Sequence, residues 1–207
     1  MAVQRAEVLA ALGDVWAANP RLTLHELFDV LSRTGLQPDS SNDEALGLCH
    51  YLSSLKPARA PLDMHGRVTT PTLLFTSGGP CALYPHRLIF YGERQPLLWG
   101  YQAIQVARLH RNLAILTAAG EQWMDPHIIQ AIELIDTTPD IAAPYAFVFE
   151  GSDSVGLWQT GKLRVVDRGR RDIITVEHVF PLVWPLQVGD DTPAGVIKEC
   201  YKLGNGV

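Results

Sequence analysis

The sequence has little cysteine and no uninterrupted apolar segment long enough to cross a membrane. Its 207 residues include three cysteines, Cys49, Cys81 and Cys200, too few and too widely spaced for a disulfide scaffold. The longest uncharged stretch, 68–86, holds prolines and glycines that break a helix, so it predicts strands and turns. We therefore expect a globular protein that does not enter the membrane.

The amino-terminal apolar run is too short for a signal peptide. Residues 8–12 are apolar, but Asp14 follows closely and no cleavage site of small residues comes after it. We therefore expect a cytoplasmic protein.

Positive charge is also scarce. Lysine and arginine number 17 against 22 aspartates and glutamates, which gives a net charge of −5. Residues 1–57 hold four basic and seven acidic side chains, a net charge of −3 (four minus seven). Since phosphates are bound by basic side chains, this acidity argues against a nucleic-acid partner, although helices so near the start are common in DNA-binding domains.

Residue spacings typical of metal and nucleotide sites are missing. The seven histidines include no pair four residues apart, and no two cysteines form C-x-x-C. Gly78-Gly79 is not followed by a helical pattern, and Gly161-Lys162 lacks the upstream glycine of a P-loop. We therefore expect neither a metal nor another cofactor.

Residues 1–57 predict a three-helix bundle. Thr23 and Glu26, and likewise Ser41 and Glu44, have the spacing of capping boxes that begin helices. Apolar residues recur at helical spacing. We expect the following side chains to be buried between the helices: Val8, Leu9, Leu12, Val15, Trp16, Leu24, Leu27, Phe28, Leu31, Leu48, Leu52 and Leu55.

The remainder predicts an antiparallel β-rich domain. Residues 58–66 are rich in proline and alanine and predict a linker, and 67–207 alternate β-branched or aromatic runs with turn residues. Asp125-Pro126 and Thr192-Pro193 predict the starts of two short helices. Similar runs in 68–136 and 144–203 suggest a degenerate internal repeat. The expected fold class is thus α+β.

Three sets of residues are candidates for function. Arg168, Arg170 and Arg171 lie in a predicted hairpin tip and could hold a phosphate or another anion. Ser77 or Cys81, with one of the histidines, could form the nucleophile and base of a small hydrolase or transferase in a cleft between helices and sheet. An exposed aromatic set could bind a partner: Tyr84, Tyr91 and Trp99.

The favoured interpretation is a binding protein rather than an enzyme. No nucleophile has a base or an orienting acid near it in the sequence, and the motif at 152–156 lacks the first glycine of a nucleophile elbow. We therefore expect a cytoplasmic binding or assembly protein that recognises a protein partner. The alternatives are the hydrolase or transferase, and a regulator that binds nucleic acid or a phosphate-bearing ligand through the arginine tip.

Overall fold

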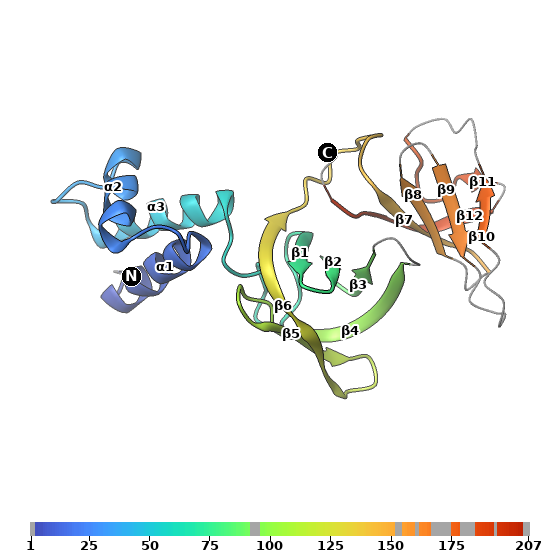
Figure 1. Cartoon of the computed structure of the whole chain (residues 1–207), viewed down its shortest axis with the longest axis horizontal. Helices are drawn as coiled ribbons and strands as arrows, with labels where there is room; N and C mark the ends of the chain where they lie inside the picture. Colours follow the sequence, from blue (N-terminus) through green and yellow to red (C-terminus); the bar gives the residue numbers. More distant parts are fainter. Residues whose placement is uncertain are drawn as a thin grey trace.

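The computed structural model of the protein describes residues 3–91, 96–151, 155–159, 162–166, 175–178, 185–192 and 194–204. These residues form three helices followed by twelve strands (Figure 1). The helices are α1 (Arg5–Ala18), α2 (Leu24–Thr34) and α3 (Asn42–Leu55).

Local capping determines where α2 and α3 begin. The Glu26 carboxylate accepts a hydrogen bond from the Thr23 backbone N–H at 2.7 Å, and the Glu26 N–H donates to the Thr23 hydroxyl. The same reciprocal pair joins Ser41 and Glu44. Both predicted capping boxes are present, and Gly35, with φ of 124°, ends α2.

The predicted three-helix bundle is wrong as a description of the packing. Helices α1 and α3 pack against each other, whereas α2 adds mainly Leu27 and Leu31 to their small core. The apolar residues of α1 are spread around the helix, so contact with α3 covers only some of them. Several side chains that were expected to be buried are exposed instead: Leu9, Trp16, Leu24, Phe28 and Leu55.

The first six strands close into a barrel (Figure 1). Each strand is antiparallel to the next, and the first also pairs with the sixth. Fully buried side chains fill the interior, among them Leu74, Leu83, Leu88 and Leu113. The strands are β1 (Thr72–Thr76), β2 (Gly79–Tyr84), β3 (Arg87–Phe90), β4 (Leu97–Val106), β5 (Asn112–Thr117) and β6 (Gln122–Leu134).

The short helix expected from Asp125-Pro126 does not form, because this segment belongs to β6. The Asp125 carboxylate does accept a hydrogen bond from His127 N–H at 2.9 Å, as a helix cap would, but the turn extends no further. The β-branched residues that follow pair with β1 and β5 on either side. The backbone hydrogen bonds to two neighbouring strands therefore outweigh the local signal for the start of a helix.

The last six strands form a second sheet in the order β10-β9-β8-β7-β12-β11. The second expected helix, from Thr192-Pro193, is also wrong, because β12 follows there and pairs with β7. The strands are β7 (Tyr145–Phe149), β8 (Val155–Gln159), β9 (Lys162–Val166), β10 (Thr175–His178), β11 (Asp191–Thr192) and β12 (Gly195–Lys202).

The barrel and the second sheet share most of their pairing order, although among the described residues β10 and β11 do not pair as β4 and β5 do. In both, the first strand pairs with the second and with the sixth, and the fifth pairs with the sixth. Descent of 68–136 and 144–203 from one duplicated unit stays a prediction. The fold class is therefore α+β and mostly β, without the expected bundle and short helices.

Hydrogen bonds and an ion pair connect the barrel to the segment after α3 and to the second sheet. Ala60 N–H donates to the Ala107 carbonyl, so the segment after α3 lies along the barrel. On the other side, Arg87 of β3 forms an ion pair with Glu199 of β12 at 2.7 Å. The domain limits 1–57, 58–66 and 67–207 stay predictions. Among the described helices, none has the length and apolarity to cross a bilayer.

Candidate functional site

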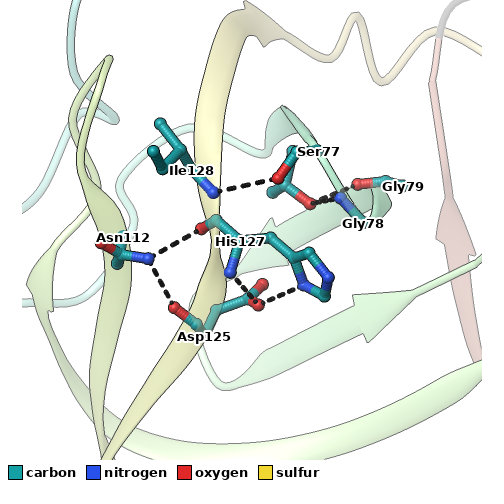
Figure 2. A network of polar contacts seen from close by, with 8 residues as sticks. Ser77, Gly78, Gly79, Asn112, Asp125, His127 and Ile128 are labelled. Atoms are coloured by element: carbon teal, nitrogen blue, oxygen red, sulfur yellow. Dashed lines mark hydrogen bonds and ion pairs between the residues drawn. The ribbon is translucent and has the colours of Figure 1, made fainter.

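A polar network joins the β1–β2 turn to β6 (Figure 2). Pro126 has no N–H to give to the β ladder, and the pairing of β5 with β6 shifts register between Asn112 and Ala114. The Asn112 side-chain amide donates to the carbonyl oxygens of Asp125 and His127 at 2.9 and 3.4 Å. Side chains thus replace ladder bonds where the strand is irregular.

The centre of this network is an aspartate–histidine pair. Nδ1 of His127 lies 2.8 Å from Oδ1 of Asp125, whose residue is 3% exposed. The second carboxylate oxygen is buried and has no hydrogen-bond partner among the described residues, while the histidine side chain is 47% exposed. A carboxylate on Nδ1 is also what orients a histidine general base.

In the part of the chain that the structure describes, neither candidate nucleophile is hydrogen-bonded to the His127 ring. The Ser77 hydroxyl accepts a hydrogen bond from Ile128 N–H at 3.3 Å, and within the described residues it has no bond to the His127 ring. Cys81 is fully buried in the barrel. Burial, and next the charge of Asp125, raise the pKa of its thiol well above the ordinary value.

The contact between Asp125 and His127 was not predicted from the sequence. Residues two apart on a strand lie on the same side of a sheet, so the spacing would have suggested this contact had the segment been predicted as a strand. Expecting a helix there separated the two side chains.

The three aromatic candidates lie in two places. The Tyr84 hydroxyl donates to the Lys202 carbonyl at 2.5 Å and that of Tyr91 to the Leu203 carbonyl, so both face the second sheet. Burial raises the pKa of each phenol. Trp99 packs edge-to-face against Trp123 at a centroid distance of 4.9 Å. Arg168, Arg170 and Arg171 lie outside the described residues.

Two clefts lie between the helices and the barrel, where the enzyme alternative placed its chemistry. The larger, of about 840 Å³, is lined by Arg21, Lys56 and His110, and His110 has a φ of 60°. The second measures about 780 Å³. Neither Ser77 nor Cys81 lines either cleft, so the candidate nucleophiles and these clefts are separate.

Several large apolar side chains are exposed on the first two helices. Five residues of α1 and α2 define what we call the helical apolar face: Leu9, Gly13, Trp16, Leu24 and Phe28. Its four large side chains are between 40% and 66% exposed. Trp16 Nε1 donates to the Leu22 carbonyl at 2.8 Å, which holds the end of α1 beside the start of α2. Gly13, Trp16 and Ala17 line a shallow hollow of about 350 Å³.

Comparison with known proteins found no similar protein. No family model matches the chain, and neither the curated proteins nor the solved structures contain a match. Within the ranges that the structure describes, no group of three or more histidine, cysteine, aspartate or glutamate side chains could hold a metal ion.

Proposed function

We propose that this chain is a cytoplasmic binding or assembly protein that recognises a protein partner through the helical apolar face. The observation that carries the proposal is the exposure of large apolar side chains on both α1 and α2: Leu9 is 66%, Leu24 48% and Phe28 45% exposed. Clustered exposed apolar side chains of this size mark interaction sites. The three cysteines are free thiols, which suits a reducing compartment.

The chemistry of the partner follows from charge. Residues 1–57 carry a net charge of −3, and exposed Glu26 and Asp29 lie on the same helix as Leu24 and Phe28. Two copies of this acidic surface would repel each other, so a second copy is disfavoured. The occupant that fits is an amphipathic helix of another protein, with apolar residues on one face and basic residues at its borders.

The helix arrangement supports a helical occupant. The core shared by α1, α2 and α3 is small, and α2 lies against the others mainly through Leu27 and Leu31. On this proposal a further helix packs on α1 and α2 and buries Leu9 and Phe28, as an additional helix does in a helix bundle. The missing side chain of Gly13 leaves the hollow beside Trp16 open to a protruding residue.

The test uses two synthetic helices of 18 residues, one with a leucine face and lysine borders and one with a leucine face and glutamate borders. We expect the lysine helix to bind and the glutamate helix not to bind, measured by fluorescence anisotropy. The double variant Leu9→Gln with Phe28→Gln should lose at least about tenfold in affinity, since buried anchors dominate such contacts. Met64→Gln, which changes a residue 92% exposed outside the helices, is the matched control.

The natural partner is sought with the same variants. A photo-reactive amino acid at position 24 should cross-link the chain to a protein partner in extracts of the native host. The cross-link should form when the rest of the chain is wild type or carries Met64→Gln, and it should be lost in the double variant. Equal binding of the lysine helix by all three proteins, together with equal capture, would overturn the proposal.

A further inference from the structure

A pair of arginines lies where the segment after α3 crosses the barrel. Arg59 and Arg108 face each other in an isolated antiparallel bridge. Ala60 N–H donates to the Ala107 carbonyl and Leu109 N–H to the Ala58 carbonyl, so the bonds flank the pair on both sides. This pattern marks a pair without hydrogen bonds of its own, in which opposed side chains stand closest on one face.

Two like charges held side by side by the backbone repel each other, and an anion between them removes the repulsion. Asp14 of α1 supplies one such anion. Its Oδ2 lies 2.7 Å from a guanidinium nitrogen of Arg59, and its Oδ1 lies 3.4 Å from one of Arg108. Asp14 is 8% exposed, whereas the two arginine side chains are 66% and 54% exposed.

The charges do not balance within this group. Two guanidinium groups share one carboxylate, which leaves one positive charge. Within the described part of the chain, Asp14 is the only carboxylate that lines the adjoining cleft of about 780 Å³. Each guanidinium has five N–H donors, and among the described residues Asp14 occupies only a few of those on Arg59 and Arg108, which leaves donors for a second anion.

The rest of the cleft determines what kind of anion fits. His50, Ser53 and Thr70 contribute polar groups, while much of the remaining lining is apolar, from Leu62, Val106 and Leu134 among others. A bare inorganic ion would leave this apolar surface in contact with water. A volume of this size holds a small organic molecule.

We propose that this cleft binds an organic monoanion, a carboxylate attached to an apolar body. The carboxylate lies between Arg59 and Arg108 beside Asp14, and the apolar body lies in the cleft between α3 and the barrel. This site is independent of the helical apolar face, and it would remain if the proposed partner function failed.

Calorimetric titration tests the proposal with octanoate, octan-1-ol and inorganic phosphate. Octanoate should bind, with octanol at least about tenfold weaker because it lacks the charge-assisted hydrogen bonds. Binding of phosphate as tight as that of octanoate would overturn the role of the apolar body. Equal affinity for octanol would overturn the role of the arginines.

Three variants separate ligand binding from a purely structural role. Arg59→Gln with Arg108→Gln should abolish octanoate binding, whereas Arg33→Gln, an exposed arginine on α2, should leave it unchanged. Asp14→Asn should tighten binding severalfold, because it frees both guanidinium groups.

If Asp14 only links α1 to the two arginines and no ligand binds there, Asp14→Asn should lower the melting temperature without a gain in octanoate affinity. That result would overturn the site. Circular dichroism checks that each variant is folded. If the double arginine variant fails to fold, the Asp14→Asn titration still decides the question.

Discussion

The helices and the barrel differ in how completely they bury their apolar side chains. In the barrel, Leu74, Leu88 and Leu113 have no exposed surface, because every strand has a neighbour on both edges and the inward side chains meet one another. In the helices, Leu9 and Phe28 remain exposed. A closed sheet completes its own core, whereas three short helices leave apolar surface for another molecule. The difference locates the proposed recognition surface.

The largest effect expected from this comparison is on stability. Leu113→Ala should lower the free energy of unfolding by about 2–5 kcal/mol, because it opens a cavity in the barrel. Leu9→Ala, at a position 66% exposed, should change it by about 0.5 kcal/mol or less. Urea denaturation followed by tryptophan fluorescence measures both. Similar losses would show that Leu9 is buried in solution and would remove the distinction.

A smaller loss of stability is expected when the polar network of Figure 2 is disrupted. A Cβ added at Gly78 would lie 2.4 Å from Nδ1 of His127, so Gly78→Ala must displace the ring from the buried Asp125 carboxylate. We expect a loss of roughly 1–3 kcal/mol. Gly100→Ala is the control, since its Cβ would meet nothing nearer than 3.8 Å. Denaturant unfolding of both variants makes the measurement, and an equal effect would show that the network is dispensable.

A smaller, pH-dependent effect is expected where the barrel meets the second sheet. The hydrogen bond from Arg87 lowers the pKa of Glu199 below its ordinary value of 4.5. The ionised form is therefore favoured in the folded state, so the pair stabilises the protein above pH 4.5 and the contribution is lost as the pH falls below that value.

Glu199→Gln should therefore lower stability by at most about 1 kcal/mol at pH 7, because the pair is partly exposed to solvent. Thermal unfolding between pH 3 and pH 7 checks this. The wild type and the variant should converge at the acid end, and a constant difference across the range would contradict the assignment.

The last expected effect is a gain in stability. Gly13 and Gly47 lie within α1 and α3, and a Cβ at either would meet no atom within 4 Å. Alanine at each position should raise stability by roughly 0.5–1 kcal/mol, since glycine is a poor helix former. Only Gly13→Ala should alter binding of the lysine helix, because Gly13 lies on the helical apolar face. Melting temperatures and anisotropy together separate the two variants.

The sequence predicted features that depend on near neighbours. Thr23 with Glu26, and Ser41 with Glu44, marked the starts of α2 and α3, because a capping box is made within four residues. The strands of the barrel were predicted in part for the same reason, from β-branched runs between turns. The packing of the helices depends on which sides of α1 and α3 meet, and periodicity alone does not determine it.

Features that depend on distant strands were not predicted. The isoleucines at 128, 129, 132 and 135 fit a helical spacing, but β1 and β5 provide partners for an extended chain, and the pairing prevails. The contact of Arg59 with Arg108 joins residues of two predicted regions, and no local signal connects them. The candidate nucleophile Ser77 was noticed, but the hydrogen bond of its hydroxyl to Ile128 depends on the closure of the barrel.

Because β12 lies near the end of the sequence, its contacts with the barrel form late during synthesis. Strand β6 closes the barrel and ends at Leu134, whereas β12, which joins β7, begins at Gly195, about 60 residues later. All strands of the barrel are therefore synthesised before the residues whose carbonyls accept hydrogen bonds from the hydroxyls of Tyr84 and Tyr91. Only when β12 emerges do the carbonyls of Lys202 and Leu203 reach these hydroxyls. A nascent chain stalled between these points would lack the acceptors of both phenol hydroxyls, and incompletely packed surface of this kind favours aggregation.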